Sequence, residues 1–300
     1  MNPEKQAIVN MHIATFLFGM TAILGKLISL NEFNMVWHRM LIASVLFMFF
    51  PKFFKLLKTT PKKTIFIFLT NGIIVAIHWL TFYGSIKIYN NASLTLACFG
   101  SVSLFAAILE PIILKKPFKK SEIILGLFVL FGLILLAKAN PENDFSLQSN
   151  YIKAILIALV SAFLAVIFTI FNKKYIADND PNVVTWAQMT GGFIFLTIAL
   201  PFVLNSGYAF EFIPSKIDIV WLVILGFLCT NIAFALEMKA LKQISAFASS
   251  IILNLEPLYG IIAAIIIFKE NETLNSWFYL GAAVIVASVF IHAWLGRERN

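Results

Sequence analysis

The sequence is poor in charged residues and in cysteine. Of its 300 residues 13% are charged and 60% are hydrophobic, whereas a soluble domain has about 25% charged and about 45–50% apolar residues. Together with a mean hydropathy of +0.88, this composition excludes a soluble protein. The two cysteines, Cys98 and Cys229, lie inside apolar stretches, which excludes a secreted disulfide framework and gives no metal-ligand spacing. We interpret both as thiols packed between helices.

The net charge of +8 does not indicate a nucleic-acid-binding protein. The lysines lie in short segments between apolar stretches and do not gather on one polar face, a pattern that favours membrane orientation signals. No small-residue cleavage site of the A-x-A kind follows the first apolar run, so we expect the N-terminus to be retained. The expected surroundings are a lipid bilayer, with no nucleic-acid partner.

Apolar runs separated by turn residues and charges predict ten membrane spans. The polar segment 140–150, NPENDFSLQSN, has the content of a solvated linker and divides five spans from five. We therefore predict an all-α integral membrane protein with one five-helix repeat at 1–139, the linker at 140–150 and a second repeat at 151–300. The predicted spans are 7–30, 34–51, 64–87, 91–114, 121–139, 150–172, 182–204, 217–240, 244–268 and 275–295.

The basic residues predict the orientation of these spans. With a cytoplasmic N-terminus, the inner loops collect most of the lysines, as the positive-inside rule requires. Both termini are then cytoplasmic, and because five is odd the second half crosses the membrane opposite to the first. The inner basic residues are Lys52, Lys55, Lys58, Lys62, Lys63, Lys115, Lys116, Lys119, Lys120, Lys173, Lys174, Lys242, Arg297 and Arg299.

Short matches between the halves support such an inverted repeat. At the second span of each half, Trp37-His38-Arg39-Met40 matches Trp186-Ala187-Gln188-Met189. A shift of 155 positions also aligns Lys87 with Lys242. Sparse identities gain weight because they fall at corresponding spans of halves that the charges already place antiparallel.

A longer pattern runs through the fourth span of each half. It reads Ile86-Lys87 through Gly126 in the first, and Leu241-Lys242-Gln243-Ile244-Ser245-Ala246 through Glu256-Pro257 to Lys269-Glu270 and Gly281 in the second. With ten spans in two halves, the whole chain resembles the EamA branch of the drug/metabolite transporter superfamily. The resemblance implies a bacterial inner-membrane carrier of small metabolites, often an amino-acid exporter, with a central cavity between the repeats. The first half departs from the pattern, because Ser101-Val102 stands where the second half has Glu256-Pro257.

Glu256 is the first candidate for the substrate site. A charged carboxylate near the midplane of a span is costly, so Glu256 could exchange a proton as the site alternates between the two sides. The alternative is a protonated glutamate that only bonds a neighbouring helix at the Pro257 break. Asn254 shares the face of Glu256 only if Pro257 unwinds the turn; a helix–helix hydrogen bond is the favoured interpretation of Asn254.

Aromatic residues on the third span form a second candidate. Trp79 and Tyr83 are one turn apart and share a face, as do His78 and Phe82. His78, Trp79 and Tyr83 could stack on an aromatic substrate or hold its ammonium group by cation–π attraction, with His78 and Trp79 the deeper pair. An interfacial aromatic belt is the equally weighted alternative. Arg39 could bind a carboxylate with its guanidinium fork, but we favour snorkelling to the headgroups from a place near the outer end of its span.

Three further polar or aromatic residues lie in apolar spans. Asn231 is near the middle of the eighth span, while Trp186 and Gln188 correspond to Trp37 and Arg39 in the repeat. For these three the sequence does not separate a cavity lining from helix packing. No zinc motif, phosphate loop or nucleophile motif stands out, so we expect no cofactor and no metal.

The sequence therefore predicts a carrier that works by alternating access. The expected partners are the bilayer and a small-molecule substrate, most simply an amino acid or an amine, moved outward, with protons through Glu256 as a hypothetical coupling ion. A monomer suffices, because one chain supplies both repeats, and a homodimer stays open. The alternative is an integral-membrane enzyme acting on lipid or isoprenoid substrates. Such an enzyme should have clustered acids, histidines or arginines at the headgroup level, and the sequence shows no such cluster.

Overall fold

The apolar stretches fold as helices joined by short loops. The computed structural model describes residues 3–115, 117–118, 120–142, 144–175, 179–241, 243–244, 252–253 and 255–297. Within these ranges every regular element is a helix, so the protein is all-α.

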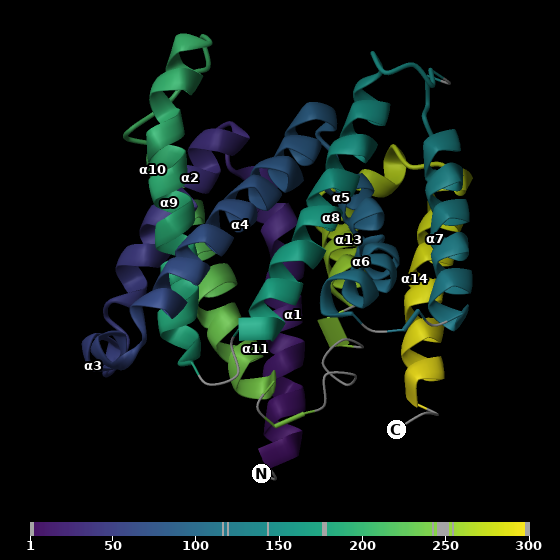
Figure 1. Ribbon diagram of the computed structural model, residues 1–300. Coiled ribbons are helices and arrows are strands. Elements are labelled where there is room, and N and C mark those ends of the chain that lie inside the picture. The colour runs from purple at the N-terminus through teal and green to yellow at the C-terminus, as the bar shows by residue number, and fades with distance from the viewer. Residues whose placement is uncertain are drawn as a thin grey trace.

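Each half supplies a similar series of helices (Figure 1). The first half contains α1 (Pro3–Leu27), α2 (Glu32–Phe47), α3 (Phe53–Thr59), α4 (Lys62–Tyr89), α5 (Ala92–Phe99), α6 (Val102–Leu114) and α7 (Lys120–Lys138). The second contains α8 (Asn150–Tyr175), α9 (Pro181–Asn205), α10 (Lys216–Gly226), the π-helix η1 (Phe227–Ile232), α11 (Ala233–Leu241), α13 (Glu256–Phe268), the 3₁₀ turn η2 (Glu270–Glu272) and α14 (Ser276–Arg297).

Many of these helices have the length and composition of membrane spans. Six helical stretches in the described part of the chain are long and apolar enough to cross a membrane, and three shorter apolar helices accompany them. The six are Pro3–Leu27, Lys62–Tyr89, Ala92–Leu114, Asn150–Asn172, Pro181–Asn205 and Lys216–Glu237. The chain is therefore a multi-pass membrane protein.

The structure differs from the predicted boundaries in four places. The predicted loop between Pro51 and Lys63 contains α3, because Phe53 is buried there against Trp186 with the ring centroids 5.4 Å apart. The predicted fourth span is interrupted between α5 and α6 at Gly100 and Ser101, and the eighth contains η1. Within the predicted ninth span, α13 begins only at Glu256, and residues 245–251 and 254 lie outside the described ranges.

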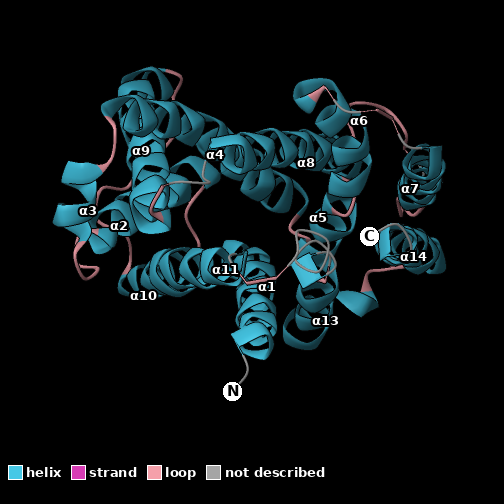
Figure 2. Cartoon of the chain, turned by 60° about the horizontal axis from the view of Figure 1, so that its bottom comes forward, coloured by secondary structure: helices cyan, strands magenta, loops and turns pink. Residues whose placement is uncertain are grey.

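The helices form two rows with a pair at one edge. Figure 2 shows α9, α4 and α8 along one side and α10, α11, α1 and α13 along the other. The fourth span connects the rows, because α5 packs on both α8 and α13. At the edge, α7 packs on α14 (Figures 1 and 2).

Contacts between the two halves are reciprocal. The third span of the first half, α4, packs on α8, the first span of the second half, and α1 packs on α11 in the same relation. Likewise α4 packs on α9, and α2 packs on α10. The first and fourth spans follow the same rule, since α1 packs on α13 and α5 packs on α8. Further contacts join equivalent spans, α2 with α9, α5 with α13 and α7 with α14. Each half therefore meets the other through the same set of spans.

Glycines allow two of these helices to cross closely. A Cβ atom at Gly72 of α4 would lie 2.1 Å from the Gln188 carbonyl oxygen, and one at Gly191 of α9 would lie 2.0 Å from the Leu69 carbonyl oxygen. Since neither backbone leaves room for a side chain, both positions require glycine. Small residues at helix crossings are typical of membrane proteins, where close backbone packing holds helices together.

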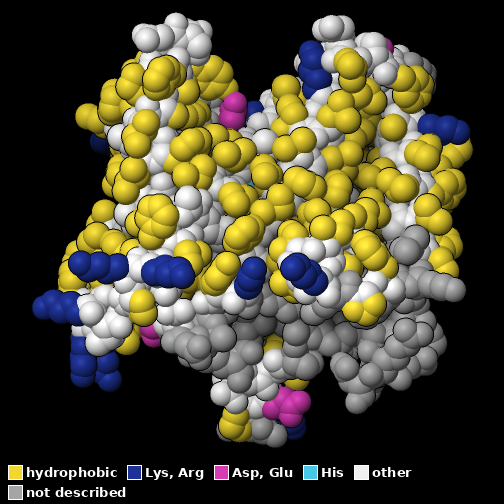
Figure 3. Space-filling view, in the orientation of Figure 1, with side chains coloured by type: hydrophobic (Ala, Val, Ile, Leu, Met, Phe, Trp, Pro, Cys, Tyr) yellow, Lys and Arg dark blue, Asp and Glu magenta, His cyan; other side chains and the backbone are white. Residues whose placement is uncertain are grey.

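The outer surface has an apolar middle and a basic edge. In Figure 3, hydrophobic side chains cover the middle of the face shown, and lysine and arginine side chains cross it lower down. Figure 1, in the same orientation, places α3 and both labelled termini toward that lower end. Exposed hydrophobic residues on α7, such as Leu127, Phe128 and Phe131, belong to the apolar surface.

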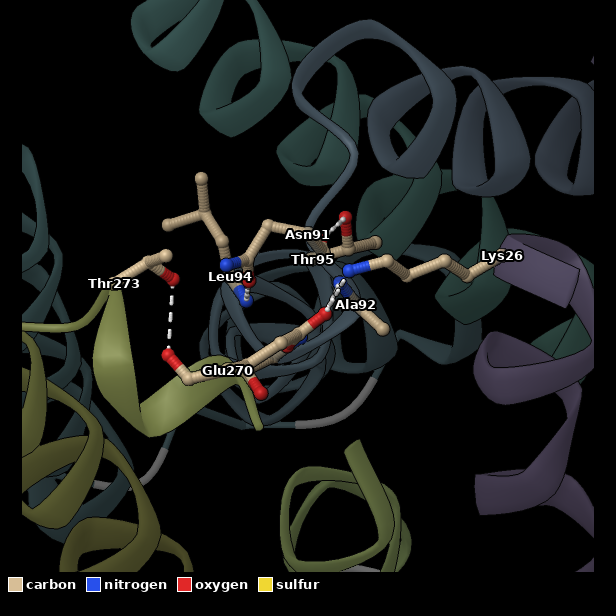
Figure 4. Close-up of polar contacts among 8 residues, drawn as sticks. Lys26, Asn91, Ala92, Leu94, Thr95, Glu270 and Thr273 are labelled. Atoms are coloured by element: carbon tan, nitrogen blue, oxygen red, sulfur yellow. Dashed lines mark hydrogen bonds and ion pairs between the residues drawn. The ribbon is translucent and has the colours of Figure 1, made fainter. Parts of the chain in front are cut away.

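One buried carboxylate joins the two halves at a helix end. Glu270 accepts hydrogen bonds from the backbone N–H groups of Ala92 (2.9 Å) and Ser93 (2.8 Å) at the start of α5, and pairs with the Lys26 ammonium at 2.9 Å (Figure 4). Burial raises the pKa of the Glu270 carboxyl, but these bonds together hold that pKa below its usual range. We call Lys26, Ala92, Ser93 and Glu270 the Glu270 clasp.

Candidate functional site

Arg39 is buried at the middle of α2. Its side chain is only 2% exposed, and it belongs to the largest fully buried side chains of the described residues. The expectation that Arg39 snorkels to the headgroups is therefore wrong. Snorkelling requires a helix end, whereas α2 runs from Glu32 to Phe47 and presents Arg39 to α4 and η1.

Aromatic and hydroxyl groups surround the guanidinium of Arg39. Its carbon Cζ lies 3.5 Å from the ring centroid of Trp79, Nη1 donates to the Tyr83 hydroxyl at 2.6 Å, and Nε donates to Thr230 Oγ1 at 2.9 Å. Trp79 and Tyr83 share one face of α4, as their spacing predicts, but the cation on that face is a side chain of the protein itself. We call Arg39, Trp79, Tyr83 and Thr230 the Arg39 cluster.

The π-helix η1 places Thr230 in this cluster. Thr230 Oγ1 donates to the carbonyl of Leu225, five residues earlier, at 2.9 Å, and so accepts from Arg39 with its remaining capacity. Next to it, fully buried Asn231 donates from Nδ2 to the Ala43 carbonyl of α2 at 3.2 Å, while its Oδ1 has no hydrogen-bond partner among the described residues. Single π-turns inside helices are frequent at functional sites.

Glu256 begins α13 and is partly buried beside α1. The two helices nearly touch there, because a Cβ atom at Gly19 would lie 3.0 Å from the Glu256 carbonyl oxygen. The Glu256 carboxyl is near enough for electrostatic interaction with Arg39 and with Glu237 of α11. No carboxylate of the described residues, however, forms an ion pair with Arg39.

Gln188 lies in a second polar cluster, between α4, α8 and α9. It donates to Asn172 Oδ1, and Asn71 donates to the same oxygen at 3.0 Å and to the Phe168 carbonyl at 3.3 Å. Asn71 Oδ1 is buried without a hydrogen-bond partner in the described part of the chain. The residue that corresponds to Arg39 in the second half thus bonds the neutral amide of Asn172.

The other predicted site residues lie apart from the Arg39 cluster. His78 Nδ1 is 3.0 Å from the Ser161 carbonyl oxygen and 2.9 Å from Ser161 Oγ, and its ring contacts the rings of Phe99 and Phe168. His78 therefore packs on α8. Trp186 packs on Phe53 of α3, with its buried Nε1 unpartnered among the described residues. Asn254 lies outside the described residues.

Two members of the Arg39 cluster were not among the predicted site residues. Arg39 itself had a signal in the sequence, since it lies in the motif shared with Trp186-Ala187-Gln188-Met189 and a guanidinium suits the face of Trp79. Thr230 had none, because its place depends on the π-turn. Within the described ranges no group of three histidine, cysteine, aspartate or glutamate side chains could hold a metal ion.

This chain is similar to curated proteins that are named transporters. It is 29% identical over 198 residues to CMP-sialic acid transporter 2 of Oryza sativa subsp. indica, covering 62% of this chain and 51% of that protein. It is 23% identical over 197 residues to an uncharacterized transporter of Methanothermobacter thermautotrophicus, covering 65% and 54% respectively. The matches therefore span about half the length of these curated relatives.

A solved structure shares the whole fold. A crystal structure of a protein superposes with a TM-score of 0.65 at 15% sequence identity and covers 98% of both chains. At this identity the likeness concerns the fold alone.

The family comparison covers nearly the entire chain. The model of the EamA-like transporter family matches twice, at residues 5–138 and 152–294, one match on each side of the predicted linker. Because this is a family of transporters, the alternative of an integral-membrane enzyme acting on lipid or isoprenoid substrates is excluded. This membrane protein belongs to the EamA-like transporter family, within the drug/metabolite transporter superfamily.

Proposed function

We propose that this transporter is a ten-span secondary carrier that moves small metabolites, amino acids or amines, by alternating access between two inverted five-helix repeats. It exports its substrate across a bacterial inner membrane and keeps both termini in the cytoplasm. The single observation that carries the proposal is the Arg39 cluster with Glu256. Charged groups buried in a membrane protein are costly and mark substrate or ion pathways.

Both halves contribute side chains to this proposed site. Arg39, Trp79 and Tyr83 come from α2 and α4, while Thr230 and Glu256 come from η1 and α13. Substrate sites of secondary transporters lie at the interface between repeats, often beside broken helices. Because α13 starts at Glu256 and η1 interrupts the eighth span, irregular backbone lies beside the charged side chains.

Reciprocal packing supports the inverted relation of the repeats. The contact of α4 with α8 corresponds to that of α1 with α11, and the contact of α4 with α9 corresponds to that of α2 with α10. A two-fold axis between the halves would produce this pattern of paired contacts. The tryptophans of the shared motif follow it as well. Trp37 packs on Phe210 in the loop before α10, and Trp186 packs on Phe53 in the segment before α4.

The basic edge supports the proposed orientation. The lysines of α3 and both labelled termini lie toward the same end of the molecule (Figures 1 and 3). The positive-inside rule would place this end in the cytoplasm. The Glu270 clasp would then lie at the outer end, where it connects α1 and α5 to η2.

Exchange transport in proteoliposomes tests the carrier function. The vesicles hold labelled amino acids, small amines and, because a rice relative is named for it, CMP-sialic acid; mass spectrometry identifies what leaves. We expect a defined solute to leave, and we expect Glu256→Gln to lose the dependence of efflux on a pH gradient. Glu272→Gln removes an exposed acid and serves as the matched control.

One result would contradict the carrier function, and a second would contradict only a proton role of Glu256. Efflux of no solute from folded protein would argue against a carrier for these classes. Unchanged pH dependence in Glu256→Gln would remove the proton role and leave the carrier function standing.

A further inference from the structure

We infer that Arg39 is the anion-binding residue of the transport site and that the substrate carries a carboxylate. The inference rests on the proposed carrier function and narrows its substrate class from amino acids or amines to solutes with a carboxylate. It starts from the surroundings of the guanidinium, which hold its position by hydrogen bonds and ring stacking and form no ion pair with it among the described residues.

Among the described residues, the charge of Arg39 has no acidic partner within bonding distance. Its hydrogen bonds go to the hydroxyls of Tyr83 and Thr230, and Trp79 supplies only the face of a ring. Arginine is almost never fully buried unless it is paired, and a buried charge without a counterion is costly. A carboxylate brought by the substrate would supply the missing negative charge.

The guanidinium also keeps donors for such a ligand. A guanidinium has five N–H donors in one plane, and the bonds to Tyr83 and Thr230 use two of them. Trp79 stacks on the plane at 3.5 Å and so fixes its orientation, which reduces the entropy lost on binding. The remaining donors lie in the plane, where a carboxylate can accept two parallel bonds.

A single cation favours a carboxylate over a phosphate. One guanidinium balances the one charge of a carboxylate, whereas a phosphate monoester carries about −1.5 to −2 charges at neutral pH. Glu256 lies near enough to Arg39 for electrostatic interaction. Its carboxylate would repel the second negative charge of a phosphate. The same glutamate suits the ammonium group of an amino acid whose carboxylate is on Arg39.

The two halves do not duplicate this group. Gln188, the counterpart of Arg39, bonds Asn172 in a neutral cluster, so the second half lacks a guanidinium at the equivalent place. The substrate would therefore bind off the symmetry axis, on the side of α2 and α4. A purely structural Arg39, which only connects α2 with α4 and η1, predicts that replacing Arg39 slows the efflux of all solutes alike.

The test uses three solutes that differ in one group each: L-phenylalanine, phenethylamine without the carboxylate, and 3-phenylpropionate without the ammonium group. Proteoliposomes are loaded with each. We expect the wild-type protein to release the two carboxylates faster than the amine. Arg39→Gln should slow the efflux of the carboxylates about 10- to 100-fold, which corresponds to the loss of a charge-assisted hydrogen bond. Arg39→Lys keeps the charge but not the fork, so it should raise KM more than it lowers kcat.

Lys55→Gln removes an exposed positive charge from α3 and is the matched control. The inference would be overturned if the amine left faster than the two carboxylates, or if Arg39→Gln released the carboxylates at the wild-type rate. In either case the carrier function would stand. If nothing leaves, the carrier function fails for these solutes, and tryptophan fluorescence in detergent decides on Arg39. A response to phenylalanine that Arg39→Gln loses supports the site, and no response in wild type overturns it.

Discussion

At the scale of single residues, the Arg39 cluster depends on an exact fit around the ring of Tyr83. Gly25 of α1 lies against that ring, and a Cβ atom there would be 2.5 Å from Tyr83 Cδ1. The ring in turn holds the hydroxyl that accepts from Arg39. The absence of a side chain at Gly25 therefore fixes the distance between α1 and the cluster.

We predict that Gly25→Ala destabilises the protein by about 1–3 kcal/mol, the usual cost of forcing an extra methyl into a packed interior. The added methyl should also displace Tyr83 from Arg39 and slow transport. Gly84→Ala is the control on α4, because a Cβ atom there would be no closer than 3.8 Å to its neighbours. Thermal unfolding of both variants measures the difference, and equal melting temperatures would contradict the packing described here.

The residue scale also shows where sequence reasoning stops. The shared face of Trp79 and Tyr83 follows from helical spacing alone, because residues four apart are neighbours on any α-helix. The fate of Arg39 does not follow from spacing, because snorkelling and burial differ only in what the neighbouring helices offer. Thr230 enters the cluster through a π-turn, and no residue pattern in the sequence predicts that turn.

At the scale of elements, helix positions were predictable and interruptions were not. All ten predicted spans contain helix, since long apolar runs can satisfy their backbone in a bilayer only in this way. The helix α3 was missed because its lysines indicate a loop, whereas Phe53 gains its stability from Trp186, far away in sequence. Breaks at Gly100–Ser101 and at η1 likewise depend on tertiary contacts.

The Glu270 clasp is an interaction between elements, and its energy should depend on pH. The pKa of Glu270 is lower in the folded protein than in the unfolded chain. Its stabilisation is therefore fully present above about pH 4.3, the pKa of an unperturbed glutamate, and is lost as the pH falls through the lower, folded value.

We predict that Glu270→Gln lowers the stability at pH 7 by about 1–2 kcal/mol, because the ion pair with Lys26 is lost and the bonds to α5 weaken. The difference from wild type should shrink as the pH falls below 4. Melting temperatures across this range measure it, with Glu272→Gln, an exposed neighbour, as the control. A difference that is constant with pH would show that the carboxylate charge does not contribute.

At the scale of the whole molecule, the clasp lies where the two halves must separate if the carrier opens at that end. Lys26 and the start of α5 belong to the first half, and Glu270 belongs to the second. The lysine distribution and the odd number of predicted spans per half predict opposite orientation of the halves. The sequence does not predict the reciprocal pairs of helices, because contacts between distant segments leave no periodic pattern in one sequence.

The central claim is that the two halves move relative to each other to carry a solute. The most direct test holds them together at the clasp, with Lys26→Cys and Glu270→Cys in a protein whose buried Cys98 and Cys229 are replaced by alanine. A reductant-cleavable bifunctional thiol reagent should stop efflux of the transported solute, and reductant should restore it. Glu270→Cys alone, treated identically, should keep its rate. Efflux at the untreated rate from fully cross-linked protein would contradict alternating access between the halves.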